Sequence, residues 1–357
     1  KAVRVLDYLE LEDRLRGGIV TATRQQRKAL DRAGVDVIES PWVGGSPVGA
    51  AKSRLTGGAA FREYDVAHCN VVGPGSVAVA RHAKRNDIPL VLHAHVTAED
   101  FGESFRFTEQ VAPALRPYLR WFYSQADLVL CPSEYTEGVL REYPVPTPIE
   151  PVTNGVDAES LEGFESLREE TRERFGLDEM VVFCVGEVFE RKGLTTFCEV
   201  AEATEYDFAW FGHYEEGAAA GEATRYWTND PPENVTFTGW MDDKRAAFGA
   251  GDVYLFPTKD ENQGIAALEA MACGKAVVLR DIPVFEEFFT DGEDCLKCDT
   301  HEEFVDALRR LDANPGLRDR LGENARETAA EHSLERVGER LVEQYERLLG
   351  ESHSGTP

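Results

Sequence analysis

The sequence predicts an α/β protein with two domains, each built around a doubly wound parallel sheet. Its 357 residues correspond to two domains of roughly 150 residues each. Short apolar runs rich in Val and Leu alternate with helical patterns through most of the chain. A β-α-β series of this kind forms a parallel sheet. The alternation stops once near the middle of the chain and then resumes, which indicates two sheets.

Six strands are expected in the first half of the chain. These runs are apolar on both sides, which is typical of strands that helices cover on both faces. Helical patterns lie between them, among them residues 18–32, 75–85 and 108–124. The strands are expected at residues 3–9, 35–40, 64–69, 89–95, 127–133 and 148–154.

A break in the pattern follows these strands. Asn154-Gly155-Val156-Asp157 is a turn signal, and residues 158–176 form a polar, acidic connector that has no strand pattern. We therefore expect two Rossmann-like domains, residues 1–165 and 166–332, that face each other across a cleft. The strands of the second domain are expected at residues 181–186, 207–212, 234–240, 252–258 and 276–280.

Residues 333–350 are expected to form an amphipathic C-terminal helix. We expect this helix to return to the N-terminal domain, and residues 351–357 to form a disordered tail. The apolar residues that recur at helical spacing in this segment are Leu334, Val337, Leu341, Tyr345 and Leu348.

Composition narrows the class of function. The formal net charge is −27, which argues against nucleic acid as a partner because such proteins need a basic surface to displace counterions. The same charge disfavours broad attraction to an anionic membrane, although a local basic patch would still bind one. Only nine of the 38 basic residues are lysines. This composition resembles that of salt-accumulating halophiles, whose cytosol screens charge repulsion within about 3 Å; an ordinary acidic protein is the alternative.

The sequence contains neither a membrane-spanning run nor an apolar secretory segment, so a cytoplasmic protein is expected. The seven cysteines mostly lie inside apolar strand or helix patterns, as buried thiols of a reducing cytosol do. Cys295 and Cys298 form a single CxxC pair without a second pair or nearby histidines. We therefore expect no metal site there.

Two glutamates give the first indication of chemistry. Glu261 and Glu269 are eight residues apart around the start of a predicted helix, which corresponds to roughly 12 Å at 1.5 Å per residue. Carboxylates accept hydrogen bonds from hydroxyl pairs, and the helix N-terminus between them suits a diphosphate. This spacing would fit a sugar, a diphosphate and a ribose in line. The alternative is that Glu261 caps the helix and Glu269 is a solvated helix residue.

The glutamate spacing, followed by residues 270–278 (AMACGKAVV), resembles the donor-site signature of the family-4 retaining glycosyltransferases of the GT-B fold. Further segments resemble that family in the same order, and together they extend over residues 3–350. A closer resemblance is to the diacylglycerol glucosyltransferases, carried by residues 93–101, 104–105, 118–123, 132–135 and 189–193. The segments that resemble the wider family are residues 17–19, 154–157, 185–193, 283–286 and 291–293.

This resemblance implies a retaining hexosyltransferase without a metal or other cofactor. Its donor would be a nucleotide-diphosphate sugar, such as UDP-glucose or GDP-mannose, and its acceptor a membrane glycerolipid. Peripheral contact with the inner face of the cell membrane would follow. The alternatives are a family-4 enzyme that acts on a polysaccharide or polyprenol-linked glycan, a nucleotide-sugar epimerase, and a binding module without turnover.

The resemblance also assigns donor-binding residues. Lys192 and Arg191 would neutralise the diphosphate as it leaves, and a solvated helix start is the alternative. The family usually has an arginine where this chain has Glu187, so Arg191 could take its place. Further donor contacts are expected from Gly264 and Ile265 at the start of the helix and from Gly18 in the N-terminal glycine loop. Met241, at the end of a strand, is expected to contact the donor as well. For Gly18 the alternative is an ordinary helix start, and for Met241 and its neighbour Trp240 it is core packing.

The catalytic group is expected to be His95, Glu261 and Lys192. His95 follows a predicted strand at its carboxyl end and corresponds to the family histidine that contacts the transferred sugar. A structural role is the alternative for His95 and more so for His93.

Acceptor contacts are expected from two segments. Glu99 and Asp100 could hold or deprotonate the acceptor hydroxyl, or could cap a helix instead. Arg116 and Arg120 lie among aromatic residues, and a basic aromatic helix can bind a lipid surface. A core helix decorated with arginines is the alternative for this segment.

Overall fold

The computed structural model describes residues 3–15, 17–95, 112–142 and 145–354. It divides the chain into two compact units, Lys1–Gly155 with Leu334–Pro357, and Val156–Ser333. The chain passes between units inside the predicted turn at residues 154–157, ten residues before the expected boundary. The boundary lies earlier because the segment around Phe164 packs in the second unit. Phe164 is buried there, and its carbonyl oxygen lies so close to Gly249 that a side chain at Gly249 would not fit.

The first unit contains a six-stranded sheet in the order β2-β1-β3-β4-β5-β6, and all of its strand pairs are parallel. Every strand lies inside a run that the sequence predicts, and each is shorter than that run. The strands are β1 (Arg4–Tyr8), β2 (Asp36–Ile38), β3 (Val66–Cys69), β4 (Leu90–His93), β5 (Leu128–Cys131) and β6 (Ile149–Pro151).

Helices cover both faces of this sheet. One face packs against α3 (Pro74–Arg85), α5 (Ala112–Tyr123) and α6 (Glu134–Arg141). The other face packs against α1 (Gly18–Arg32) and α15 (Leu334–Ser354). The short helix α2 (Pro47–Leu55) was not predicted, and its side chains are mostly exposed.

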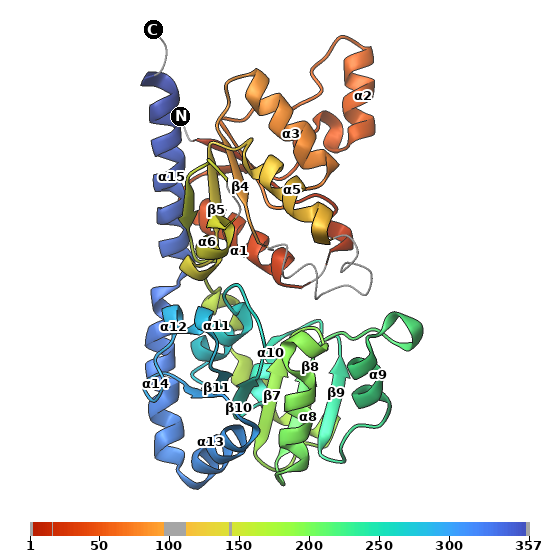
Figure 1. Ribbon diagram of the computed structural model, residues 1–357, viewed down its shortest axis with the longest axis vertical. Coiled ribbons are helices and arrows are strands. Elements are labelled where there is room, and N and C mark those ends of the chain that lie inside the picture. Colours follow the sequence, from red (N-terminus) through yellow and green to blue (C-terminus); the bar gives the residue numbers. More distant parts are fainter. Residues whose placement is uncertain (1–2, 16, 96–111, 143–144, 355–357) are drawn as a thin grey trace. The chain divides into compact units, whose positions relative to one another are not determined.

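The C-terminal helix α15 lies beside α1 in the first unit (Figure 1). The five apolar residues predicted for its inner side are all buried. A side-chain carbon at Gly338 would lie 2.5 Å from the Ala29 carbonyl oxygen, so glycine permits the close packing of the two helices. An ion pair between Arg32 and Glu335, 2.5 Å long, adds to this contact.

The second unit contains another parallel sheet, in the order β12-β11-β10-β7-β8-β9. Its sixth strand, β12, was not predicted, because Lys297 interrupts its short apolar run. The strands are β7 (Val181–Val185), β8 (Asp207–Phe211), β9 (Val235–Gly239), β10 (Val253–Phe256), β11 (Ala276–Arg280) and β12 (Leu296–Cys298).

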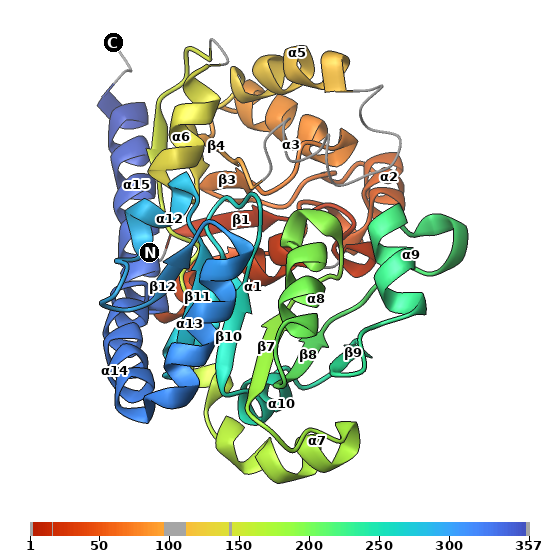
Figure 2. The same cartoon turned by 60° about the horizontal axis from the view of Figure 1, so that its bottom comes forward.

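The second unit is also layered. Figure 2 shows α8 and α13 in front of its strands. Its helices are α7 (Arg168–Phe175), α8 (Leu194–Glu202), α9 (Glu222–Asn229), α10 (Arg245–Ala250), α11 (Ile265–Ala272), α12 (Pro283–Phe288), α13 (His301–Ala313) and α14 (Pro315–Glu331).

All seven cysteines of the chain are buried free thiols. Burial raises the pKa of Cys298 to about 12, so this thiol is protonated at neutral pH. Within the described ranges, no helix combines the length and the apolar character that crossing a membrane requires.

Candidate functional site

The first candidate site lies in the second unit, at the carboxyl ends of β7 and β10. These strands are neighbours in the middle of the sheet. The loop after β7 contains a 3-10 turn, Glu190–Lys192, and the loop after β10 leads from Pro257 to α11. Ligands of parallel α/β sheets bind at this edge.

Hydrogen bonds join these two loops. The Lys259 amide donates to the Arg191 carbonyl over 2.8 Å, and Arg191 Nη1 donates to the Asp260 carbonyl over 3.0 Å. The buried Thr258 hydroxyl lies 3.0 Å from the same Asp260 oxygen. The loops therefore form one support for the side chains that they carry.

Gly193 fixes how closely the loops approach. Its φ is +85°, a left-handed conformation that favours glycine. A side-chain carbon there would lie 2.1 Å from the Pro257 carbonyl oxygen. Only glycine meets both conditions at this position.

The joined loops bring Lys192 and Glu261 into an ion pair. Glu261 is only 8% exposed, and its Oε1 also lies 3.3 Å from the Thr258 hydroxyl. Lys192 Nζ lies 5.3 Å from the centre of the Phe256 ring, a cation-π distance. Two of the three residues predicted to be catalytic are thus in direct contact.

The second glutamate has a lysine partner as well. Glu269 is 4% exposed and forms an ion pair with Lys244, which lies directly before α10. Lys244 was not predicted, because nothing in its local pattern relates it to a residue 25 positions later. A buried carboxylate needs such a partner, so the pairing accounts for the burial of Glu269.

Both glutamates are arranged around the start of α11. Glu261 precedes the helix and Glu269 lies in its second turn, while Gly264 is the N-cap with φ +94°. The alternative roles of helix cap for Glu261 and solvated helix residue for Glu269 are therefore wrong. Ile265 is the first helical residue. The Ala267 and Leu268 amides of this turn donate to the Gly264 carbonyl, so the Ile265 and Ala266 amides lie before the first helical hydrogen bonds.

Glu187 occupies the position where the family usually has an arginine. Its side chain is exposed. The Arg191 guanidinium carbon lies 5.3 Å from the centre of the Phe189 ring, and this side chain also bonds the Asp260 carbonyl. Arg191 is therefore held between the two loops.

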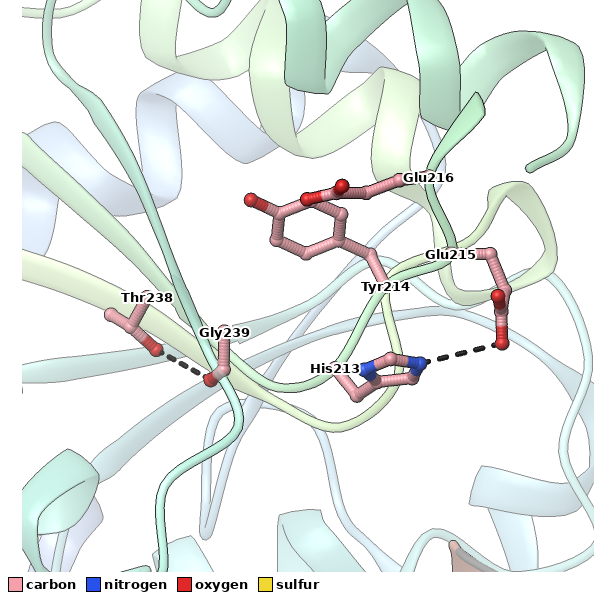
Figure 3. A pocket seen from close by; sticks show the side chains of 6 residues that line it. All are labelled: His213, Tyr214, Glu215, Glu216, Thr238 and Gly239. Atoms are coloured by element: carbon pink, nitrogen blue, oxygen red, sulfur yellow. Dashed lines mark hydrogen bonds and ion pairs between the residues drawn. The ribbon is translucent and has the colours of Figure 1, made fainter. Parts of the chain in front are cut away.

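A pocket of about 450 Å³ lies in the same unit, where β8 and β9 end (Figure 3). Tyr214 presents its ring here, and His213 Nε2 lies 3.4 Å from Glu215 Oε1. The pocket is lined by His213, Tyr214, Glu215, Glu216, Thr238 and Gly239. This pocket was not predicted, although a ligand contact was expected from Trp240 and Met241, which directly follow Gly239.

Core packing was the alternative role for Trp240 and Met241. Trp240 is 59% exposed and its Nε1 lies 3.3 Å from Asp242 Oδ1. Met241 is half-buried. Core packing is therefore excluded for Trp240, while a contact with ligand stays a prediction for both residues.

The first unit contributes His95, which lies two residues beyond β4. It is 9% exposed, and its Nε2 lies 2.9 Å from Asn70 Oδ1. Its ring stacks on that of His93, with 4.0 Å between the ring centres. Burial lowers the pKa of His95 to about 3, so the imidazole is neutral. The expected acceptor residues Glu99 and Asp100 lie outside the described residues.

Other predicted residues of the first unit have the following positions. Gly18 is the first residue of α1, and Gly17 before it has a positive φ of 89°. Arg116 lies in α5. Arg120 and Trp121 of that helix are exposed, whereas Phe122 is buried. The helix thus has an apolar inner side and a basic aromatic outer side.

No group of three or more residues that could hold a metal ion occurs in the part of the chain that the structure describes. Catalysis without a metal therefore stays a prediction from the resemblance.

Comparisons with known proteins identify the family. Residues 167–328 match the family model described as glycosyl transferases group 1, and residues 41–160 match the model described as glycosyltransferase family 4. The processive diacylglycerol alpha-glucosyltransferase of Acholeplasma laidlawii is 28% identical over 354 residues, which cover 97% of this chain and 99% of that protein. The chain belongs to glycosyltransferase family 4. It is accordingly an enzyme, a hexosyltransferase of this family.

Two solved structures share the fold. Sucrose-phosphate synthase from Thermosynechococcus elongatus superposes with a TM-score of 0.77 at 19% identity, over 98% of this chain and 100% of that one. The Anabaena protein HepE, in complex with UDP and glucose, gives 0.73 at 17% identity, over 96% and 98% of the two chains. The predicted GT-B fold class is confirmed.

Proposed function

We propose that this family-4 enzyme transfers a hexose from a nucleotide-diphosphate sugar to a hydroxyl group of a membrane glycerolipid, with retention of anomeric configuration. The observation that carries the proposal is the ion pair of Lys192 with the buried Glu261 before the start of α11. It combines a cation, a carboxylate and the start of a helix, which are the groups that an activated sugar needs.

Lys192 and the first amides of α11 would stabilise the diphosphate. Negative charge builds up there as the bond to the hexose breaks, and preorganised cations and amides lower the energy of that state. Because Glu261 already holds Lys192 in place, the ammonium group needs little reorganisation when the donor binds. Arg191, held by the Asp260 carbonyl, would add a second cation.

The two glutamates would bind the hydroxyl groups at the ends of the donor. Glu261 would accept hydrogen bonds from the hexose, and Glu269, held by Lys244, from the ribose. The pocket at the ends of β8 and β9 would take the base, with the Tyr214 ring as a stacking surface. His95 would contact a hydroxyl of the transferred hexose, as the family resemblance implies.

A lipid acceptor is supported by the relative from Acholeplasma laidlawii, whose name states that it acts on diacylglycerol. It is also supported by the charge distribution. Residues 41–86 contain six basic and two acidic residues in a chain of net charge −27. All six basic side chains are exposed: Lys52, Arg54, Arg62, Arg81, Lys84 and Arg85.

Apolar side chains accompany this basic segment. Leu55 of α2 is 88% exposed, and Val48 and Trp121 are exposed as well. Exposed cations together with apolar and aromatic residues are typical of surfaces that bind anionic lipids. Peripheral membrane contact through α2, α3 and α5 is therefore part of the proposal.

The experiment incubates the purified protein in concentrated KCl with labelled UDP-glucose or GDP-mannose and vesicles that contain diacylglycerol. Label that moves to the lipid supports the proposal. An altered nucleotide sugar would indicate an epimerase, and donor binding without turnover a binding module, and both results contradict it. Transfer to a polysaccharide or polyprenol-linked glycan alone contradicts the lipid acceptor.

Variants connect that activity to the site. Lys192→Ala and Glu261→Ala are each expected to lower transfer at least a hundredfold, because they remove charge that stabilises the transition state. Arg309→Ala is the matched control, since Arg309 forms an exposed pair with Asp306 on α13. Full activity of either site variant would contradict the assigned site.

A further inference from the structure

A chain of buried polar side chains leads to His95 from inside the first unit. Asp7 of β1 is fully buried, and Asn70, directly after β3, is 2% exposed. Asn70 Nδ2 donates to Asp7 Oδ1 over 2.8 Å, and Asn70 Oδ1 lies 2.9 Å from His95 Nε2. The polar groups of three separate segments are therefore connected.

The orientation of the Asn70 amide follows from its partners. Its Nδ2 faces the Asp7 carboxylate and, at 3.4 Å, the Tyr8 carbonyl, and both of these only accept. Its Oδ1 also accepts a hydrogen bond from Gln26 Nε2 at 3.3 Å. The oxygen of Asn70 must therefore be the atom that faces His95.

Asp7 is itself held in place. Gln26 Nε2 donates to Asp7 Oδ2 over 2.5 Å, and Arg27 Nε donates to Asp7 Oδ1 over 3.3 Å. Burial raises the pKa of Asp7 to about 6, and the coulombic effect of Arg27 opposes this shift. Since every partner is itself buried or half-buried, the network can hold Asn70 in one orientation.

The oxygen of Asn70 decides which nitrogen of His95 carries the proton. A neutral imidazole has one N–H group and one acceptor nitrogen. Because Asn70 Oδ1 can only accept, Nε2 of His95 must be the donor, and Nδ1 becomes the acceptor nitrogen. A substrate hydroxyl that meets Nδ1 would donate its hydrogen to the ring.

We propose that Asn70 is a positioning residue for hexose transfer, which holds His95 as the tautomer protonated on Nε2 so that Nδ1 accepts a hydrogen bond from a hydroxyl of the transferred hexose. Asp7 fixes the amide of Asn70 for this purpose. The inference rests on the proposed function, because it needs His95 to contact the hexose. It adds two buried residues that no motif of the sequence indicated.

The first test is the tautomer of His95 in the unmodified protein. Two-bond ¹H–¹⁵N spectra of ¹⁵N-histidine-labelled protein distinguish the tautomers, and His95→Gln identifies the signal. The inference expects the proton on Nε2. A proton on Nδ1 would overturn it before any variant of Asn70 is made.

The second test removes the acceptor. Asn70→Leu has a similar volume but cannot accept, so His95 is expected to populate both tautomers, with kcat about tenfold lower and the KM for the donor within about threefold. Asn70→Asp retains an oxygen that accepts from His95 Nε2. One proton held between the new carboxyl group and Asp7 replaces the hydrogen bond that Asn70 donates to Asp7. This variant is expected to keep the Nε2–H tautomer and to recover most of kcat.

Tyr345→Phe is the matched control. Tyr345 of α15 makes a buried hydrogen bond of 2.6 Å to His68 Nδ1, in the same unit but outside the bonds to His95. It is expected to change the His68 signal and leave both the His95 tautomer and kcat unaltered. Equal losses of kcat in all three variants would indicate a structural effect and overturn the inference.

Failure of the proposed function gives a different result. A wild type that transfers no hexose contradicts the proposed function and this inference with it. A wild type that transfers hexose while Asn70→Leu keeps its kcat contradicts this inference alone.

Discussion

Glu261 and Glu269 are buried carboxylates, and each is neutralised by a lysine from a distant part of the chain. Their spacing in sequence indicated a site because eight residues fit the start of one helix. The lysines could not be found in that way, since strand and loop geometry brings them in. Lys192 was predicted from a family resemblance, whereas Lys244 was missed.

Asn70 was also missed, although its sequence position carried a signal. It follows directly after β3 at the carboxyl end of a parallel strand, where ligand sites of this fold class lie. Asp7 carried a second signal, as an acidic residue inside an apolar strand pattern. What the sequence could not give is the distance between them, which depends on the pairing of β1 with β3.

The buried histidines predict how stability depends on pH. Burial lowers the pKa of His68 and of His95 to about 3 in the folded protein, against about 6.5 in an unfolded chain. Below pH 6.5 the unfolded chain therefore binds protons that the folded protein does not. Each histidine lowers the free energy of unfolding by up to about 1.4 kcal/mol per pH unit there.

Asp7 has the opposite effect on the pH dependence of stability, because it binds one proton more readily in the folded protein than in the unfolded chain. Its pKa of about 6 in the folded protein lies above the usual 3.8, so its contribution to stability grows as the pH falls below 6. His68, His95 and His93, whose pKa burial also lowers, outnumber it. Urea unfolding at pH 7 and pH 5 is expected to give a lower free energy at pH 5, with a smaller difference in His68→Gln. Equal stability at both values would contradict the burial of neutral histidines.

At the scale of elements, the strands were predicted closely because both faces of each parallel sheet are covered. That burial makes the strands continuously apolar in sequence. The three-residue β12 and the exposed α2 leave no comparable pattern, so neither was predicted. The connector between the sheets folds as two 3-10 turns and α7, whose position depends on packing against α10 that a polar pattern does not reveal.

Gly193 offers a test of the support for the site. Gly193→Ala adds a side-chain carbon 2.1 Å from the Pro257 carbonyl oxygen and also meets a positive φ. It is expected to lower stability by about 3 kcal/mol or more and to abolish most transfer, because the two loops must separate.

Gly176→Ala is the control for that substitution. Gly176 has a φ of +65° at the end of α7 and no atom within 4 Å of an added side-chain carbon. A loss of only about 1 kcal/mol with normal activity is expected. Thermal unfolding and the transfer assay compare the two, and similar losses in both would contradict the close approach at Gly193.

Helix α5 leads to a prediction about lipid binding. Arg116→Glu/Arg120→Glu is expected to weaken binding to vesicles of diacylglycerol and anionic phospholipid at least tenfold, since each basic residue near the surface contributes about 1 kcal/mol. Arg309→Glu/Arg320→Glu makes the same change in net charge on exposed positions of the second unit. Co-sedimentation at the lowest KCl concentration that keeps the protein folded measures the effect. Equal binding by both double variants would argue against α5.

At the scale of the whole molecule, a net charge of −27 predicts that stability depends on salt. Repulsion between like charges is screened within about 10 Å at 0.1 M salt and about 3 Å at 1 M. The melting temperature is expected to rise by about 5–10 °C between 0.1 and 2 M KCl. Scanning calorimetry over this range tests it. An unchanged or lower melting temperature would favour an ordinary acidic protein over one adapted to a salt-rich cytosol.

Calorimetric titration of UDP, GDP and the corresponding sugar nucleotides tests most directly which part of the donor each of Lys192, Glu261 and Glu269 binds. Lys192→Met is expected to weaken binding of the diphosphate and of the sugar nucleotide alike, by at least tenfold. Glu269→Gln is expected to do the same through the ribose, which both ligands contain. Glu261→Gln is expected to weaken mainly the sugar nucleotide, because only that ligand carries the hexose and the glutamine oxygen can still accept a hydrogen bond from Lys192. Loss of UDP or GDP affinity in Glu261→Gln equal to its loss of sugar-nucleotide affinity would contradict the assignment of Glu261 to the hexose, and unchanged binding by Lys192→Met would contradict the account as a whole.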